Sequence, residues 1–299
     1  MPSLKGLQLR AELFFQIRRF FRNQGFLEVD TPVRIPAPIP EAHIDAVPSH
    51  GWFLQTSPES CMKRLLSQGY ENIFQICKVF RQEEYGARHL PEFTMLEWYR
   101  ARADYSHLME DCENLLDFCI GNLWGKKPFV YQGESPDLSR PWPRVTVSEA
   151  FLKHAGISVE DALATDRFDE IMAFNVEPAL GANPVFLMDY PMEKAALARP
   201  KPGNPKVAER FELYIGGMEL ANAFSELTDP EIQRERFDQE EKERLQAGKA
   251  PYPPPVRFLQ ALETMPPSAG IALGMDRLAM LFADTTDIAK VNAFTPDEL

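Results

Sequence analysis

The sequence predicts an α+β fold in which helices flank an antiparallel β-sheet. Runs of β-forming residues follow one another across hairpin turns, and helices of unequal length separate them. This arrangement is typical of an antiparallel sheet rather than of a regular alternation of strands and helices. The chain also contains neither a P-loop nor a GxGxxG pattern, which disfavours the common nucleotide-binding folds with parallel sheets.

The composition predicts a single large domain over residues 1–299. Hydrophobic residues make up 44% of the chain, which is ample for one large core. No run is long and apolar enough to span a membrane, and Met1 leads into a charged segment rather than a signal peptide. The net charge of −12 disfavours broad contact with a nucleic acid backbone. The four cysteines show no metal-binding spacing, so we expect a reduced, cytoplasmic protein.

The first elements can be placed from periodicity and turn signals. Apolar residues recur at helical spacing in Leu4–Asn23, which predicts an amphipathic helix. Gly25 is expected to end this helix, and residues 26–29 follow as a strand. Residues 32–48 are rich in proline and are predicted as an irregular surface loop over or beside the site. A short helix is predicted at residues 61–68.

The later elements follow in the same way. Ser148 is expected to cap a helix that comes after a strand at residues 145–147. Residues 158–180 are predicted as two small helices that form a peripheral insertion. The other predicted elements are helices at 104–124, 230–247, 257–263 and 276–282, and strands at 186–190, 208–215 and 271–273.

A strand, a polar loop and a second strand are predicted around residues 79–99. Arg81 and Glu83 are two residues apart, so on one strand they would share a face. The same parity places Phe93, Glu97 and Tyr99 on one face of the returning strand. On these residues alone, an ordinary amphipathic hairpin with a charged outer face is the commoner interpretation.

Resemblance favours the functional interpretation of this hairpin. The segment FRQEEYGARHLPEFTMLEW resembles motif 2 of the class II aminoacyl-tRNA synthetases, and most closely that of their lysine-specific branch. GIALGMDRL near the end of the chain resembles motif 3 of the same family, and the first helix with its following strand resembles motif 1. The resemblance implies a class II synthetase-like catalytic domain with an antiparallel sheet. Because motif 1 forms the dimer interface in that family, it also implies a homodimer.

Glu212 and Glu219 are a candidate pair of metal ligands. They are an odd number of residues apart, but a hairpin turn at Gly216 and Gly217 can bring both onto one face. Two converging carboxylates need a cation, a shared proton or a cationic ligand, although two surface glutamates on a hairpin would look the same. The segment ELYIGGMELANAFSEL resembles the part of lysyl-tRNA synthetase in which these two glutamates bind Mg²⁺.

The resemblance implies an ATP site in which Arg81 and Arg277 are the catalytic residues. Arg81 would bridge the substrate carboxylate and the α-phosphate. Phe93 and Arg277 would enclose the adenine ring, and Glu83 with the backbone beside His89 would read it. His89 would also reach the terminal phosphates. The implied ATP-binding residues are Arg81, Glu83, His89, Leu90, Phe93, Glu219, Leu220, Gly274 and Arg277.

The implied amino-acid pocket is rich in carboxylates. Glu59 would meet one substrate amine, and Glu97, Tyr99 and Glu226 would surround the far ammonium group. Three carboxylates and a phenol suit a substrate with two positive charges, such as lysine, whereas an aspartate or asparagine substrate would require a cationic side chain there. The implied substrate-binding residues are Ser57, Pro58, Glu59, Glu97, Tyr99, Asn222, Phe224, Glu226 and Ala272.

The resemblance implies ATP-dependent activation of a lysine-type amino acid as its adenylate, with Mg²⁺ and without an enzyme nucleophile. The motif 1 helix begins close to Met1, so we expect no anticodon-binding domain, and the charge of −12 makes tRNA an unlikely partner. The chain resembles the truncated lysyl-tRNA synthetase paralogs that modify translation elongation factor P more closely than it resembles a true lysyl-tRNA synthetase. In that family (R)-β-lysine is joined to the ε-amine of a lysine on the factor.

One residue supports the choice of (R)-β-lysine. Ala272 stands where the synthetases usually have glycine, and its methyl group would disfavour an α-amino group. A methyl group discriminates by roughly 1–3 kcal/mol, which gives a preference, and a neutral exchange is the alternative. Two other functions remain open. They are a minimal lysyl-tRNA synthetase that charges tRNA and a non-catalytic paralog that acts as a regulator.

Overall fold

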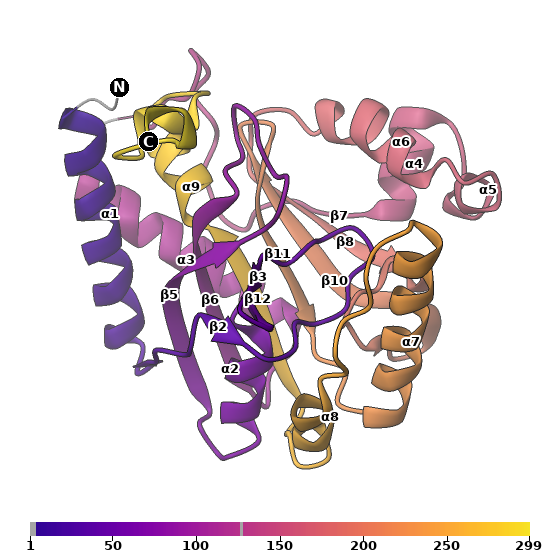
Figure 1. Cartoon of the computed structure of the whole chain (residues 1–299). Coiled ribbons are helices and arrows are strands. Elements are labelled where there is room, and N and C mark those ends of the chain that lie inside the picture. Colours follow the sequence, from indigo (N-terminus) through magenta and orange to yellow (C-terminus); the bar gives the residue numbers. More distant parts are fainter. Residues whose placement is uncertain (1–3, 126–127) are drawn as a thin grey trace.

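A large mixed β-sheet forms the centre of the chain (Figure 1). A computed structural model describes residues 4–125 and 128–299. The strands of the sheet run in the order β1-β5-β6-β12-β11-β10-β8-β7, and β9 pairs with β10. From β5 to β8 all neighbours are antiparallel, whereas β1 with β5 and β7 with β8 are parallel. The predicted antiparallel sheet is therefore confirmed for its centre, and the two parallel pairs at its edges were not predicted.

The strands of this sheet agree closely with the predicted ones where the sequence alternates or turns sharply. Their bounds are β1 (Leu27–Glu28), β5 (Asn72–Phe80), β6 (Glu92–Ala101), β7 (Arg144–Thr146), β8 (Val185–Pro191), β9 (Pro200–Lys201), β10 (Asn204–Ile215), β11 (Met218–Ser225) and β12 (Ser268–Gly274). The hairpin of β5 and β6 is confirmed, and Val79 pairs with Phe93 next to the loop that joins the two strands.

The α-helices also lie close to their predicted positions. Their bounds are α1 (Leu4–Asn23), α2 (Glu59–Leu66), α3 (Tyr105–Leu123), α4 (Val147–Ala155), α5 (Val159–Ala164), α6 (Phe168–Ile171), α7 (Pro230–Gln246), α8 (Val256–Leu262) and α9 (Met275–Phe282). None of the described helices is long and apolar enough to cross a membrane.

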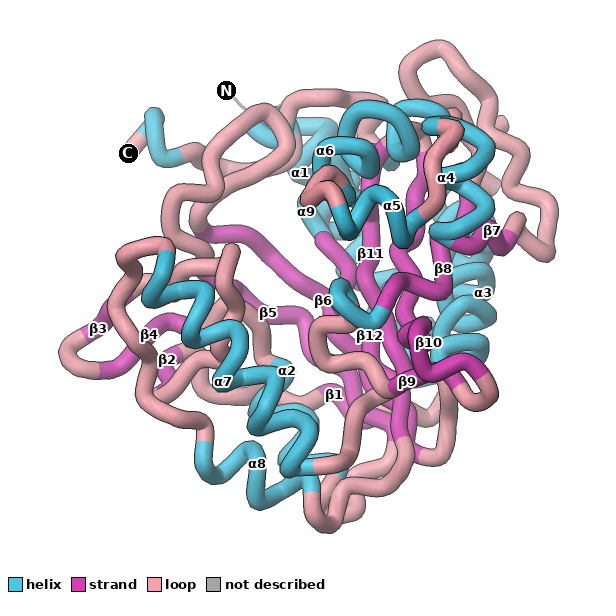
Figure 2. The backbone as a smooth tube through the Cα atoms, turned by 90° about the vertical axis from the view of Figure 1, so that its right-hand side faces the viewer, coloured by secondary structure: helices cyan, strands magenta, loops and turns pink. Residues whose placement is uncertain are grey.

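The helices form two layers, one on each face of the sheet. In both views, α1 and α3 lie on one side and α7 and α8 on the other (Figures 1 and 2). Leu96 and Trp98 of β6 point to the first side, where they join a core with α1, α3 and α9. Tyr99, the next residue, points to the second side and packs among residues of α2, α7 and α8. This alternation follows from the two-residue period of a strand, and it leaves the second face for the site.

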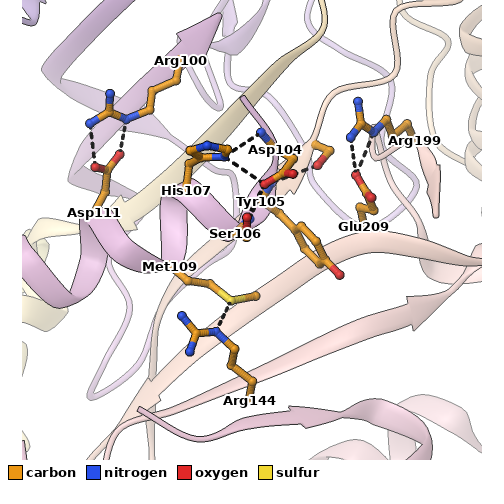
Figure 3. A network of polar contacts seen from close by, with 11 residues as sticks. Arg100, Asp104, Tyr105, Ser106, His107, Met109, Asp111, Arg144, Arg199 and Glu209 are labelled. Atoms are coloured by element: carbon orange, nitrogen blue, oxygen red, sulfur yellow. Dashed lines mark hydrogen bonds and ion pairs between the residues drawn. The ribbon is translucent and has the colours of Figure 1, made fainter. Parts of the chain in front are cut away.

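Charged side chains fix α3 to the sheet on the first side (Figure 3). Arg100 donates from two of its guanidinium nitrogens to the Asp111 carboxylate, each at 2.7 Å. The Trp98 indole donates to the same carboxylate at 3.1 Å. Asp104 caps the helix by accepting from the Ser106 amide at 2.9 Å, as expected for an N-terminal cap. These contacts hold β6, the central strand of the site, against a rigid helix.

The helical insertion shares a small core with α4, β8 and β10. The predicted two small helices are α5 and α6, and a π-helix at Met172–Val176 and a 3₁₀-helix at Glu177–Ala179 continue the segment. Phe151 and Phe168 stack there with ring centroids 4.9 Å apart. The predicted cap at Ser148 is wrong, because the helix begins earlier in the chain and Thr146 caps it. Thr146 accepts from the Glu149 amide at 3.1 Å and forms a capping box.

The proline-rich segment 32–48 is more regular than predicted. It contributes β2 (Arg34–Ile35) and the start of β3 (Pro48–Ser49), which pair with β4 (Trp52–Leu54) in a second, three-stranded sheet. Prolines suit the edges of such a short sheet, where a backbone N–H is not needed. The part between β2 and β3 passes over the site, as predicted, and its residues 41–46 are called the strap below.

Candidate active site

A cavity of about 230 Å³ lies on the second face of the sheet. Its floor comes from β6, β11 and β12, and the loop after β5 and the strap close it from above. Most of the predicted site residues line it. They are Ser57, Glu59, Arg81, His89, Leu90, Phe93, Glu97, Tyr99, Glu219, Leu220, Asn222, Phe224, Ala272, Gly274 and Arg277. Segments more than 200 residues apart in sequence are thus brought together at one place.

Four predicted site residues do not line the cavity. Glu226 is buried behind it, Pro58 is the N-terminal cap position of α2, and Glu212 lies behind Glu219 on the neighbouring strand. The fourth is Glu83, and the prediction that it shares a strand face with Arg81 is wrong. β5 ends at Phe80, and Glu83 is exposed in a turn with φ of +66°.

The backbone shows why the strand ends before Arg81. The Arg81 amide donates across the hairpin to the Pro91 carbonyl at 2.9 Å. The next amide, of Gln82, turns away from the hairpin and donates to the backbone carbonyl of Asp45 in the strap at 2.7 Å. The carboxyl that the turn presents to the cavity is consequently Glu84, which pairs with Arg81 at 3.4 Å. Neither contact has a local sequence signal.

One end of the cavity carries the acidic cluster that was predicted for a lysine-type substrate. Ser57 donates to Glu97 at 2.5 Å and Tyr99 donates to the same carboxylate at 3.1 Å. Burial and then the charge of Glu59 raise the pKa of Glu97 to about 8. Burial and the carboxylates nearby likewise raise the pKa of Glu226 to about 8, against the effect of Lys63. Both carboxyl groups therefore lie in a site that favours an added positive charge.

Lys63 is a member of this cluster that was not predicted from the sequence. Its side chain is 1% exposed, and its ammonium group forms ion pairs with Glu59 at 2.5 Å and with Glu226. Burial acts to lower the pKa of Lys63, but the two carboxylates outweigh it and the pKa is raised. Glu59 and Lys63 are four residues apart on α2, a spacing that places them on one helix face and could have revealed the pair.

Two glycines of β12 differ in what their surroundings demand. A Cβ at Gly270 would overlap the Tyr99 ring and the Glu226 carboxylate, so the pocket requires glycine there. A Cβ at Gly274 would meet Arg277 atoms at 3.8 Å or more, which is ordinary contact. A need for glycine at position 274 therefore stays a prediction that depends on ATP. Between them, Ala272 pairs with Glu97 on one side and with Asn222 on the other.

The other end of the cavity is rich in cationic side chains. The Arg81 guanidinium lies over the Phe93 ring, 5.2 Å from its centre. Arg277 donates to the Glu219 carbonyl at 2.9 Å and to its carboxylate at 3.1 Å. A second nitrogen of Arg277 lies 2.5 Å from His89 Nε2. Burial and the Arg277 charge lower the pKa of His89, so a neutral imidazole accepts this hydrogen bond.

Arg277 is aimed into the cavity by its buried neighbour Asp276. The Asp276 carboxylate accepts from Arg10 of α1 at 2.6 Å and from the Thr94 amide of β6 at 2.6 Å. Arg10 also donates to the Thr94 hydroxyl at 2.9 Å. The start of α9 is therefore fixed to both α1 and β6, and Arg277 follows directly.

Glu212 and Glu219 do lie on one face, and a β-bulge is the reason. Leu213 pairs with Ala221 and the next residue, Tyr214, pairs with Glu219, so Leu220 has no partner on β10. An extra residue of this kind shifts the alternation by one and returns Glu219 to the face of Glu212. Burial and then the Glu212 charge raise the pKa of Glu219.

The donor set fits a hard divalent cation. A repelling carboxylate pair is stabilised by a cation between them, and Mg²⁺ prefers oxygen ligands. Arg210 donates to Glu212 at 2.7 Å and the Tyr214 hydroxyl donates to its other oxygen at 2.7 Å. These contacts hold Glu212 in place. Two carboxylates are too few for an octahedral ion, so nucleotide phosphates and water would supply the remaining ligands.

Known proteins resemble this chain over nearly all of its length. A family profile described as tRNA synthetases class II (D, K and N) matches residues 3–298. The elongation factor P–(R)-β-lysine ligase of Enterobacter sp. (strain 638) is 38% identical over 312 residues, which cover 99% of this chain and 96% of that protein. The ligase of the same name from Histophilus somni (strain 2336) is 40% identical over 317 residues, with 99% and 96% covered.

A lysine–tRNA ligase is a relative of comparable identity but longer chain. The protein of this name from Moorella thermoacetica is 38% identical over 321 residues, which cover 98% of this chain and 65% of that ligase. The three sequence motifs, the sheet that carries them and these matches agree. The chain belongs to the class II tRNA synthetase family and, within it, to the group of the elongation factor P–(R)-β-lysine ligases.

Proposed function

We propose that the enzyme activates a lysine-type amino acid with ATP and transfers it to the ε-amine of a lysine on translation elongation factor P. The observation that supports this proposal best is the net charge of the buried acidic cluster. Glu59, Glu97 and Glu226 contribute three negative charges when ionised and Lys63 contributes one positive charge, which leaves −2. Lysine and β-lysine each carry two ammonium groups, so either neutralises this end of the cavity.

Charge at the opposite end supports activation of the substrate carboxylate. Arg81 and Arg277 face the cavity within reach of a bound nucleotide, and they would stabilise the negative charge that develops on the α-phosphate. The substrate carboxylate would attack the α-phosphorus in line while pyrophosphate leaves. His89, Leu90 and Phe93 would position the nucleotide from the loop and from β6. When bound, Mg²⁺ would neutralise phosphate charge beside Glu212 and Glu219.

We propose (R)-β-lysine as the preferred amino acid because of the position of Ala272. Its neighbours across β12 are Glu97 and Asn222, so its methyl group stands on the floor of the acidic end. An amine displaced by one carbon would avoid this methyl group. The two ligases matched over 96% of their own length carry (R)-β-lysine in their names. Because the acceptor is a translation factor, we place the reaction in the cytoplasm.

We also propose a homodimer formed through α1. This helix exposes Leu4 (73%) and Phe15 (55%), and the following strand exposes Leu27 (50%). Exposed apolar side chains of this size would be buried if a partner covered this part of the surface. A sedimentation coefficient of a monomer at working concentration would refute this interface.

Charging of tRNA is the second candidate, and the identity to lysine–tRNA ligase favours it. The net charge of −12 opposes it, because a negatively charged protein repels the phosphate backbone of a nucleic acid. A regulatory paralog is disfavoured because Arg81, Glu212, Glu219 and Arg277 are all present. The experiment offers labelled lysine or (R)-β-lysine, ATP, elongation factor P and tRNA in one reaction. Label in the protein fraction supports the proposal, and label in tRNA alone contradicts it.

A further inference from the structure

The cavity is lined by six carboxyl side chains, and Glu41 of the strap differs from the others. The five others each have a polar partner. The pairs are Glu59 with Lys63, Glu84 with Arg81, Glu97 with Ser57, Glu219 with Arg277 and Asp276 with Arg10. Within the described part of the chain, the Glu41 carboxyl group makes no hydrogen bond or ion pair. A carboxyl group without such a partner in a polar cavity is available to a bound molecule.

The backbone at Glu41 is nevertheless held firmly. Arg244 of α7, which is 2% exposed, donates to the Glu41 carbonyl at 3.0 Å and forms an ion pair with Asp45 at 2.8 Å. Glu240 accepts from the Ala42 amide at 2.6 Å. The strap is thereby fastened on its outer side to a helix, while the Glu41 side chain is directed to the cavity. This is the construction expected of a positioned functional group rather than of a mobile surface glutamate.

Charged groups of the site and of the strap's surroundings act on the Glu41 carboxyl group. Burial raises the pKa of Glu41 to about 7, Arg81 and Arg210 lower it, and Glu59 and Glu240 raise it. Arg81 faces the carboxylate end of the substrate and Glu59 faces an amine, according to the proposed function. Glu41 lines the same cavity as these two residues, so it faces the space in which the adenylate and its carbonyl carbon would lie.

We propose that Glu41 is the general base of the transfer step. The inference rests on the proposed function, because it requires a lysine ε-amine as acceptor. The Glu41 carboxylate takes a proton from the incoming ε-ammonium group. The amine nitrogen then attacks the adenylate carbonyl and a C–N bond forms. The C–O bond to phosphate breaks, and AMP leaves with its electron pair. The second proton on nitrogen and the proton on Glu41 pass to solvent.

The chemistry of this step needs a base that the activation step does not. A lysine ε-amine is almost fully protonated at neutral pH and is then no nucleophile. A base that is about half ionised near pH 7 is well suited to remove the proton, and burial gives Glu41 this property. The substrate carboxylate, in contrast, is already ionised when it attacks ATP.

The experiment compares wild type and Glu41→Gln in three assays with the same amino acid. Amino-acid-dependent pyrophosphate exchange measures adenylate formation. Hydroxylamine trapping measures transfer to an amine that is neutral at pH 7 and needs no base. Transfer to elongation factor P measures attack by a lysine. We expect Glu41→Gln to keep the first two activities and to lose about 100-fold in the third, a typical loss for a general base. Transfer should recover partly at pH 9, where more of the acceptor amine is neutral.

His43→Gln is the matched control, because His43 is an exposed residue of the same strap. It should leave all three activities unchanged. Equal transfer by Glu41→Gln and wild type would overturn the inference and leave the proposed function intact. A raised KM for the amino acid in exchange, with hydroxylamine trapping equally reduced, would also overturn it, because Glu41 would then bind the substrate amine. Wild type that makes hydroxamate but never modifies the factor would contradict the proposed function itself.

Discussion

Replacement of Lys63 by methionine tests how the acidic cluster is organised. Methionine keeps the length of the buried stem, which lies near the Phe224 and Phe258 rings, with the ammonium nitrogen 5.2 and 5.8 Å from their centres. It removes the charge that pairs with Glu59 and Glu226. The two carboxylates then lose their common partner while they stay buried.

The expected cost can be worked out from burial. Removal of one partner from a buried ion pair costs about 3–5 kcal/mol, because an uncompensated charge remains. The pKa of Glu226 is already raised to about 8, so this carboxyl group can become neutral at pH 7, and we expect the lower end of the range. At about 2 °C per kcal/mol for a chain of this size, Tm should fall by about 6 °C.

Function should change as well as stability. Glu59 would no longer be held in place to accept a charge-assisted hydrogen bond from the substrate, which is worth about 1.5–3 kcal/mol. The KM for lysine should therefore rise by about 10- to 100-fold. The KM for ATP should stay unchanged, because Arg81 and Arg277 lie at the other end of the cavity.

Thermal unfolding and pyrophosphate exchange at varied lysine and ATP measure these effects. Lys78→Met is the control, since Lys78 forms an exposed ion pair with Glu92 at 3.4 Å and such pairs contribute little. A Lys63→Met protein with the Tm and the lysine KM of wild type would refute the assigned role.

Three further predictions concern the same pocket. Gly270→Ala should abolish lysine activation and lower stability by about 1–3 kcal/mol through overlap with Tyr99 and Glu226, which exchange assays and denaturant unfolding will show. Ala272→Gly should raise kcat/KM for α-lysine relative to (R)-β-lysine by an amount that corresponds to roughly 1–3 kcal/mol. Lysine binding at pH 7 should release protons, since Glu97 and Glu226 have pKa values near 8 without ligand and an ammonium group lowers them. Affinity should therefore rise from pH 6 to pH 8, and calorimetry in buffers of different ionisation enthalpy measures the release.

The elements that the sequence predicted well have strong local signals. The motif 2 hairpin could be placed because two β-rich runs flank a polar turn, and β5 and β6 are found there. The first helix could be placed because its apolar residues recur at one helical period, and its bounds Leu4–Asn23 are confirmed. Most of the predicted site residues also line one cavity, because the three motifs determine which strands and turns carry them.

The parts that were missed depend on contacts between distant segments. Glu41 lies in a proline-rich stretch without periodicity. Its position is fixed by α7, where Arg244, 203 residues away, donates to its carbonyl and Glu240 accepts from the Ala42 amide. The bulge at Leu220 has no local sequence signal, so a shared face for the two metal-site glutamates was one possibility among several until the strand register was known. Glu83 was misplaced because a hydrogen bond from Gln82 to the strap ends the strand.

The intact mass of elongation factor P after incubation with the enzyme and ATP tests the proposed reaction most directly. With (R)-β-lysine we predict a gain of one lysyl residue on a lysine ε-amine, and with α-lysine a smaller yield of the same product. An unchanged mass, while pyrophosphate exchange proceeds and tRNA becomes charged, would contradict the proposed acceptor.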